Sequence, residues 1–302
     1  MKIYASLTTI PSRLDKIDEP LKSILRDRFD GVFLNLPYKS RRGREYPQEA
    51  IDALVRRMDS DKLIITRVDH DHGPITKLVG SLDRINPEDF VVVFDDDRIA
   101  KKSLYGVFRR EFEKNPHGAY SLGGWIRSGF PTRYRNVLRN RHTTPVDSLM
   151  GVTCIGFRRG SIDKQELLNF KRGDKRLDNL DDMRISGYLA SKSIMRYSIG
   201  ADPKLYLSDY PMGTETLSGS LGFWYVNKQV MDDFREEGLF TTKSVDGGVS
   251  VEFFVLFLLL SLIGMGYIFL RYRSDNRVMA AMIIVVLLFL VILSNWIRSL
   301  TL

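Results

Sequence analysis

The stretch FVVVFDDDRIA, from Phe90 to Ala100, joins an apolar run directly to three consecutive aspartates. A continuous apolar run of this kind is typical of a strand that a parallel sheet buries on both faces. In open α/β sheets, ligands bind beyond the carboxyl ends of the strands, where Asp95, Asp96 and Asp97 fall. Three adjacent carboxylates repel one another unless a cation shares their site. The stretch therefore predicts a central strand that ends in a cation-dependent ligand site.

Two of these carboxylates are placed to bind one ion. Asp95 and Asp97 are separated by a single residue, so both can reach one hard divalent cation, which prefers oxygen ligands. Such an ion could bridge to phosphate groups. A solvated acidic turn, or an N-cap ahead of a helix that begins near Ser103, is the alternative interpretation.

Outward from this strand, short apolar stretches alternate with amphipathic ones. Strands and helices in alternation predict an α/β fold, a Rossmann-like and mostly parallel sheet with helices on both faces. The expected strands are residues 3–7, 32–36, 63–68, 90–94, 119–122, 152–157 and 195–199. The expected helices are residues 16–26, 48–58, 76–84, 103–113 and 181–191.

Two long apolar runs occupy the C-terminal part of the chain, at about residues 253–270 and 278–297. A helix needs about 20 apolar residues to cross the hydrocarbon core of a bilayer. Both runs are therefore predicted to be transmembrane helices, with Tyr272 and Trp296 near their ends, where amphipathic rings favour the headgroup layer. Two central helices of a soluble core are the alternative. We expect a soluble domain over residues 1–245 and a membrane anchor over residues 246–302.

The N-terminus and the cysteine content indicate the cellular compartment in which the soluble domain lies. MKIYASLTTIPSRL has no long apolar segment and is typical of a first strand rather than a signal peptide. Cys154 is the only cysteine, which excludes an internal disulfide framework and fits a reducing compartment. We therefore expect a multi-pass membrane protein with a cytosolic soluble domain, although Arg271, Arg273 and Arg277 between the two apolar runs favour the opposite orientation.

The formal net charge of +8 fits an acidic membrane surface or an anionic substrate. Nucleic acid is not the expected partner, because the sequence has no basic helix, zinc-ligand spacing or aromatic RNA-binding signature.

A second element, DHDHGPITKL, ends at Leu78. Gly73 and Pro74 interrupt the chain just before a helix expected to begin near Thr76. Lys77 falls in the first turn of that helix, where a cation opposes the helix dipole. A lysine beside exposed N-terminal amides suits phosphate. An ordinary surface lysine next to a threonine cap is the alternative.

A further acidic pair, Asp181 and Asp182, lies in LDNLDDMRISGYLASK, where it would open a helix. Carboxylates at a helix start can cap the helix and are favoured by its dipole. The functional alternative is that one of the two acts as a general base in a cleft. An acidic strand end, a phosphate-suited helix start and a separate carboxylate together indicate transfer from a nucleotide-activated donor.

These motifs and their order resemble the nucleotide-sugar-dependent glycosyltransferases of the GT-A fold, and most closely a branch seen in bacteria and large DNA viruses. SLTTIPSRL resembles the first strand and nucleotide-facing loop of that branch, and GPITKL resembles its phosphate-side element. VFDDD resembles its Asp-x-Asp metal motif, and LDDMRISGYL is similar to the acidic pair and helix that supply the base in inverting members. The likeness covers about residues 2–199.

The resemblance implies a metal-dependent, inverting transferase domain over residues 1–245, acting between a nucleotide-sugar donor and a glycan, glycolipid or other lipid-linked acceptor. By resemblance, the residues on the donor side are Thr8, Arg13, Lys77, Asp95 and Asp96 for the nucleotide sugar, and Asp95 and Asp97 for Mn²⁺ or Mg²⁺.

The same resemblance assigns the acceptor side. Asp182 would deprotonate the acceptor hydroxyl; Asp181 is the other candidate, because this sequence reads Asp-Asp where the family commonly has Glu-Asp. GGWIRSG and GVTCIGF would line the acceptor side, with Gly124 in the first of them and Trp125 stacking on a sugar ring.

Two other functions fit parts of the pattern. Asp95 and Asp97 also resemble the nucleophile strand of aspartate-dependent phosphatases, but Ile99 stands where that family commonly has Thr or Val. A membrane-anchored, non-catalytic carbohydrate-binding or scaffolding protein is the non-enzymatic alternative.

Overall fold

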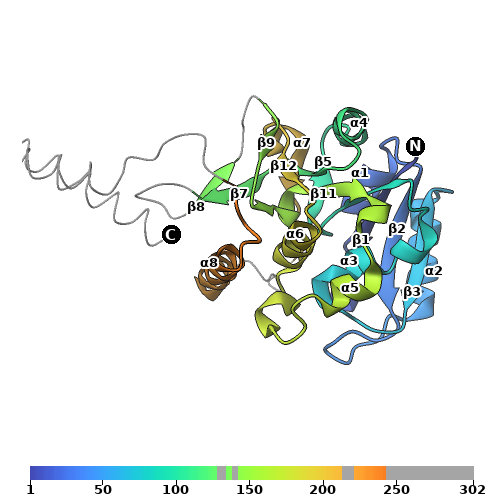
Figure 1. The fold of residues 1–302 in the computed structure, drawn as a ribbon. Coiled ribbons are helices and arrows are strands. Elements are labelled where there is room, and N and C mark those ends of the chain that lie inside the picture. Colours follow the sequence, from blue (N-terminus) through green and yellow to red (C-terminus); the bar gives the residue numbers. More distant parts are fainter. Residues whose placement is uncertain (128–133, 138–141, 213–220, 243–302) are drawn as a thin grey trace, which may run out of the picture. The chain divides into compact units, whose positions relative to one another are not determined.

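The computed structural model describes residues 1–127, 134–137, 142–212 and 221–242. Residues 1–126 and 136–242 form one compact unit, and residues 127–135 and 243–302 are assigned to a second. The first unit is built around an eight-stranded sheet (Figure 1). In sheet order its strands are β3 (Leu63–Val68), β2 (Gly31–Pro37), β1 (Ile3–Thr8), β4 (Phe90–Val93), β11 (Ile155–Arg158), β6 (Ala119–Ser121), β12 (Arg196–Ser198) and β9 (Thr144–Pro145).

The sheet is mostly parallel, as the alternating pattern predicted. Strands β3, β2, β1 and β4 run parallel, β11 is antiparallel to β4 and β6, and β12 is parallel to β6. β9 then pairs antiparallel with β12. Within this sheet, β11 and β9 therefore run against the other six strands.

Helices cover both faces of the sheet, which confirms the predicted layers (Figure 1). Because successive side chains of a strand point to opposite faces, Val92 of β4 packs into one apolar core while Val91 and Val93 pack into the other. The first core takes in α1 (Asp18–Leu25), α2 (Gln48–Met58) and α4 (Tyr105–Lys114). The second takes in α3 (Thr76–Val79), α5 (Lys164–Asn169) and α6 (Asp181–Ser191).

Shorter elements complete the described part of the chain. In one smaller sheet, β10 (Ser148–Leu149) pairs antiparallel with β7 (Gly124–Arg127). In another, β13 (Leu207–Asp209) pairs antiparallel with β5 (Arg98–Ala100). The remaining strand and α-helices are β8 (Tyr134–Val137), α7 (Pro203–Tyr206) and α8 (Leu221–Glu236). The short 3₁₀ helices are η1 (Pro11–Arg13), η2 (Gly73–Ile75), η3 (Leu82–Arg84), η4 (Gly151–Thr153), η5 (Arg159–Ser161) and η6 (Lys175–Asp178).

Two predicted elements depart most from their expected bounds. The helix predicted over residues 76–84 breaks after Val79, where Gly80 lies so close to β2 that a Cβ would come 2.5 Å from Asn35 Oδ1. The strand predicted over residues 152–157 begins only at Ile155, because η4 precedes it and Cys154 has a φ of 67°.

Among the residues that the structure describes, no helix combines the length and the apolar character that a membrane crossing requires. The runs at about 253–270 and 278–297 lie outside those residues, as does the expected domain boundary at residue 245. The membrane anchor remains a prediction from the sequence.

Candidate functional site

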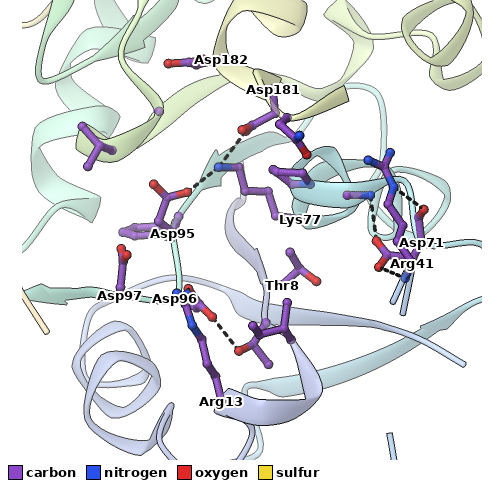
Figure 2. Close-up of a pocket in the computed structure, with 18 of the residues that line it drawn as sticks. Thr8, Arg13, Arg41, Asp71, Lys77, Asp95, Asp96, Asp97, Asp181 and Asp182 are labelled. Atoms are coloured by element: carbon purple, nitrogen blue, oxygen red, sulfur yellow. Dashed lines mark hydrogen bonds and ion pairs between the residues drawn. The ribbon is translucent and has the colours of Figure 1, made fainter. Parts of the chain in front are cut away.

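A cavity of about 750 Å³ lies at the edge of the sheet where β1 and β4 end (Figure 2). Asp95, Asp96 and Asp97 follow β4 there, and Thr8 is the last residue of the parallel neighbour β1. The Thr8 hydroxyl donates to the Asn35 carbonyl of β2 at 2.7 Å. The acidic strand end therefore lies on a cavity, as its position after a buried strand predicted.

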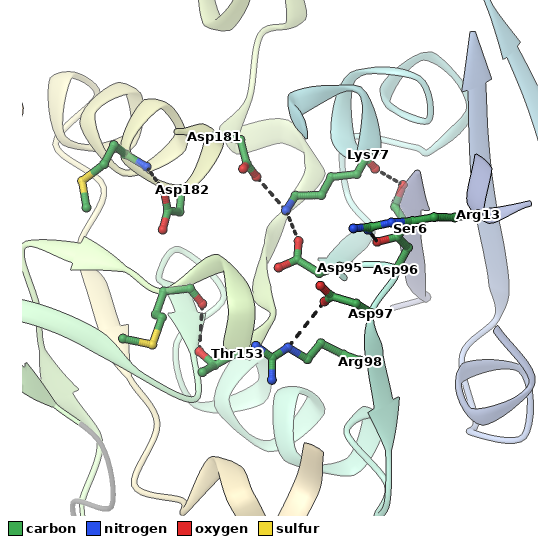
Figure 3. A network of polar contacts seen from close by, with 12 residues as sticks. Ser6, Arg13, Lys77, Asp95, Asp96, Asp97, Arg98, Thr153, Asp181 and Asp182 are labelled. Atoms are coloured by element: carbon green, nitrogen blue, oxygen red, sulfur yellow. Dashed lines mark hydrogen bonds and ion pairs between the residues drawn. The ribbon is translucent and has the colours of Figure 1, made fainter. Parts of the chain in front are cut away.

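Lys77 occupies the centre of this site. Its Nζ lies 2.5 Å from Asp95 Oδ1 and 2.7 Å from Asp181 Oδ2, and its side chain is only 5% exposed (Figures 2 and 3). The Lys77 carbonyl accepts hydrogen bonds from Ser6 Oγ at 2.6 Å and Asn35 Nδ2 at 3.0 Å, which fixes α3 to the sheet. Burial works to lower the pKa of Lys77, but the two carboxylates outweigh it and raise that pKa above its ordinary value. Lys77 thus stays charged and joins two acidic segments.

Asp96 belongs to a separate buried ion pair. Its Oδ1 lies 2.7 Å from Arg13 Nη1, and its Oδ2 accepts a hydrogen bond from Thr9 Oγ1 at 2.6 Å. Burial raises the pKa of Asp96 to about 6, although Arg13 and Thr9 oppose this shift. Asp96 and Arg13, both expected near the nucleotide, therefore neutralise each other while lining the cavity.

Asp95 and Asp97 fit a divalent cation. Asp97 Oδ1 is buried and accepts no hydrogen bond from the described residues; it forms an ion pair with Arg98 Nε at 3.6 Å. Burial and the charge of Asp95 raise the pKa of Asp97. Burial also acts to raise the pKa of Asp95, but Lys77 outweighs it and holds that pKa below its ordinary value. A carboxylate oxygen that accepts no hydrogen bond, next to an ionised carboxylate, is available to a hard cation, which prefers oxygen ligands.

The protein supplies only part of such an ion's ligands. Among the described residues, no group of three or more His, Cys, Asp and Glu side chains is placed to hold a metal. Mg²⁺ is usually bound through one or two carboxylates, with substrate phosphates and water as the other ligands. Two carboxylates therefore match an ion that arrives with a phosphorylated substrate.

The capping role considered for the acidic strand end is not supported. Asp27, not Asp95 to Asp97, caps α4: its Oδ2 accepts hydrogen bonds from the backbone N–H groups of Leu104 at 2.7 Å and Tyr105 at 3.1 Å. Asp96 is buried, whereas the side chains of Asp95 and Asp97 are 29% and 31% exposed.

Asp181 and Asp182 both lie in the first turn of α6, but their surroundings differ. Asp181 is bound to Lys77, whereas Asp182 Oδ1 accepts a hydrogen bond from the Met183 backbone N–H at 2.8 Å and lies apart from the Lys77 contacts (Figure 3). Burial and the charge of Asp181 raise the pKa of Asp182 to about 7. The N-cap residue is Leu180, which makes no side-chain capping bond. Asp182 is therefore a carboxylate that can exchange a proton near neutral pH.

Of the two residues expected on the acceptor side, Trp125 and Gly124, only Trp125 lines the cavity. Gly124 instead packs against the neighbouring strand, where a Cβ would lie 2.8 Å from Ser148 O. Gly124 therefore serves the pairing of β7 with β10.

Several residues that line the cavity were not identified from the sequence. They include Phe223, Trp224 and Asn227 of α8, and Arg41, Arg42 and Arg44 of the loop after β2. A signal for each group is present, because FWY opens an amphipathic stretch at Phe223 and RRGR places three arginines around one glycine. Arg41 Nε donates to Asp71 O at 3.1 Å and Arg41 Nη1 to Asp178 O at 3.2 Å, which connects this loop to both neighbouring segments.

No protein-family model matches the sequence, and no curated protein matches it. Solved structures with similarity to the chain include the mannosyltransferase PcManGT from Pyrobaculum calidifontis in complex with GDP-Man and Mn²⁺, at 14% identity and a TM-score of 0.48, covering 80% of this chain and 65% of that chain. S. aureus TarS in complex with UDP matches at 16% identity and a TM-score of 0.42, covering 78% and 65%.

This chain spans less than two thirds of the length of both structures. Their TM-scores and identities are low, so the function proposed below rests on the residues of the site.

Proposed function

We propose that the protein is a metal-dependent glycosyltransferase that moves a sugar from a nucleotide-sugar donor to an acceptor hydroxyl with inversion at the anomeric carbon. One observation carries this proposal: Asp95 and Asp97, which fit a cation, line the same cavity as Asp182, a carboxylate with a pKa of about 7. A donor diphosphate needs the cation that Asp95 and Asp97 would hold, and an acceptor hydroxyl needs a base such as Asp182.

On the donor side, the diphosphate would lie at the ends of β1 and β4. Asp95 and Asp97 would hold Mn²⁺ or Mg²⁺, which when bound neutralises the diphosphate and stabilises it as a leaving group. Lys77 keeps Asp95 ionised, and the Arg13–Asp96 pair fixes the backbone between the two metal ligands. Thr8 lies at the same edge, beside the expected nucleotide.

On the acceptor side, Asp182 would take the proton from the acceptor hydroxyl. That oxygen would attack the anomeric carbon from the face opposite the diphosphate, and the bond between the anomeric carbon and the phosphate oxygen would break with its electron pair leaving on the nucleoside diphosphate. A general base is most effective when its pKa lies near the pH at which the enzyme works. Asp181 is less suited to this step, because Lys77 holds its carboxylate at 2.7 Å.

The setting of the reaction follows from the C-terminal apolar runs. We propose a cytosolic domain anchored by two membrane helices, so that glycan, glycolipid or other lipid-linked acceptors at the membrane surface are within reach.

The test is release of nucleoside diphosphate by the full chain. With a panel of UDP- and GDP-sugars and Mn²⁺, at least one donor should be hydrolysed slowly, because water can take the place of the acceptor beside Asp182. EDTA should stop the release, and Mn²⁺ should restore it. No release from any donor of the panel would contradict the proposal, and a phosphoaspartate trapped by acid quenching would support a phosphatase instead.

A further inference from the structure

Three aromatic side chains form one wall of the cavity, called here the aromatic wall: Trp125 of β7 with Phe223 and Trp224 of α8. The rings of Trp125 and Trp224 have centroids 5.6 Å apart at 66°, and those of Phe223 and Trp224 lie 5.8 Å apart at 85°. Trp224 nevertheless remains 44% exposed. A large apolar surface that lines a cavity and stays exposed is typical of a binding surface.

The aromatic wall is held by helix packing. α8 lies beside α6 (Figure 1), and Phe234 of α8 packs edge-on against Phe170 with centroids 5.8 Å apart. Gly187 of α6 permits this approach, because a Cβ there would come 2.4 Å from the Phe234 ring. Arg235 Nη1, near the end of α8, lies 3.1 Å from Asp147 Oδ2. The helix that carries two of the wall residues is thus fixed to α6, whose first turn contains Asp182.

Polar groups stand beside this apolar surface. Asn227 lies one turn after Phe223, lines the cavity and is buried; its Nδ2 donates to the Phe223 carbonyl at 3.0 Å. Asp182 lines the same cavity. An occupant must therefore offer both an apolar face for the rings and hydroxyl groups for an amide and a carboxylate.

Two classes of occupant differ in how they meet this demand. A lipid chain would cover the rings but would take water from Asn227 and Asp182 without replacing its hydrogen bonds, which is costly. A sugar ring has a C–H face that stacks on an indole and a rim of hydroxyls for the polar groups.

We propose that the aromatic wall binds a sugar ring of the acceptor, so that the acceptor is a carbohydrate at the point of transfer. This inference rests on the proposed function and specifies its acceptor class. Trp224 provides the main stacking surface, and the ring that lies on it presents a hydroxyl toward Asp182.

The test is saturation-transfer NMR on the full chain, kept free of sugar-based detergents. The probes are the methyl glycosides of glucose, galactose, mannose and N-acetylglucosamine, with octanol as the alkyl probe. The C–H protons of at least one glycoside should receive saturation from the wild type. Trp224→Ala should weaken that binding about two- to tenfold, the loss expected for one stacking contact. Tyr225→Ala is the matched control, because Tyr225 is the next residue of the same helix and is 64% exposed.

The outcomes separate this inference from the proposed function. Mn²⁺-dependent binding of UDP or GDP, measured on the same samples, should be equal in wild type, Trp224→Ala and Tyr225→Ala. Weaker glycoside binding in Trp224→Ala alone supports the aromatic wall. Glycoside binding that is undiminished in Trp224→Ala, no glycoside binding by the wild type, or Trp224-dependent binding of octanol alone would overturn it while nucleotide binding still supports the transferase. Absence of nucleotide binding from the wild type would count against the transferase itself.

Discussion

Asp182 is the proposed general base of the transfer. Asp182→Asn should lower turnover by about 10²- to 10⁴-fold, the usual contribution of a positioned base, and leave Mn²⁺-dependent nucleotide binding unchanged. Because the pKa of Asp182 is raised to about 7, wild-type turnover should rise with pH through that value as the carboxylate ionises. Initial rates between pH 5 and pH 9 measure both effects. A wild-type pH profile that is flat across pH 7 would contradict the assignment.

The same variant has a pH-dependent stability signature that Asp181→Asn should show more weakly. The pKa of Asp182 rises from an ordinary 3.8 to about 7 on folding, so its ionisation opposes folding increasingly between these values and fully above pH 7. Asp182→Asn should therefore melt at a higher temperature than wild type at pH 8, with a smaller difference at pH 5. Asp181→Asn should gain less at pH 8: burial raises the pKa of Asp181 as well, but its carboxylate lies 2.7 Å from the buried ammonium of Lys77, and that contact would be lost.

For individual site residues, the sequence indicated which residue types matter but not which side chains they pair with. Asp95, Asp97 and Asp182, which line the cavity, could be singled out because each lies in an acidic cluster, at the end of a buried strand or at an expected helix start. The contact of Lys77 with Asp181 joins segments far apart in the chain, and the Arg13–Asp96 pair spans 83 residues. Local sequence patterns carry no information on such pairings.

The helix pair α6 and α8 is the element that connects the base to the aromatic wall. Gly187→Ala should push α8 away from α6, because the new Cβ would come 2.4 Å from the buried Phe234 ring. Overpacking of this kind costs about 1–3 kcal/mol, so thermal unfolding should occur several degrees lower. Glycoside binding should weaken with it, whereas Mn²⁺-dependent nucleotide binding at the ends of β1 and β4 should persist.

Gly222→Ala is the matched glycine control. Gly222 lies in the first turn of α8, and a Cβ there would meet nothing within 4 Å. Alanine is the better helix former by up to about 1 kcal/mol, so this variant should melt at the wild-type temperature or above it. Equal melting of Gly187→Ala and wild type would mean that α8 does not pack on α6 as described.

Elements with a long local pattern were predictable. α2, α6 and β3 begin and end at the residues predicted for them, because each carries a clear apolar period. Strands of two to four residues, such as β10 and β7, are too short to show a period, and their pairing partners decide whether they form. α8 was missed although Val226, Val230 and Phe234 recur at helical spacing.

For the molecule as a whole, the sequence indicated the layers of the fold but not the strand order. A sheet buried on both faces follows from the continuous apolar run before Asp95. The reversal at β11 does not, because it depends on Ile155 pairing with Val93 although α4 and the six strands β5 to β10 lie between them in the chain. The same reversal brings Gly151 beside Asp182, where a Cβ would lie 3.3 Å from the Asp182 Cβ. One wall of the site is thus set by topology alone.

The most direct measurement of the central claim is calorimetric titration of UDP and GDP into the full chain with and without Mn²⁺. Wild type should bind at least one of them in a Mn²⁺-dependent manner, and that ligand at 100 times its Kd should stabilise the fold by about 2.7 kcal/mol. Asp97→Asn should lose the Mn²⁺ dependence without a loss of stability, because it replaces a carboxylate whose Oδ1 accepts no hydrogen bond from the described residues. Asp83→Asn, an exposed carboxylate paired with Lys164, should bind as wild type does. Undiminished Mn²⁺-dependent binding by Asp97→Asn, or none by wild type, would contradict the account.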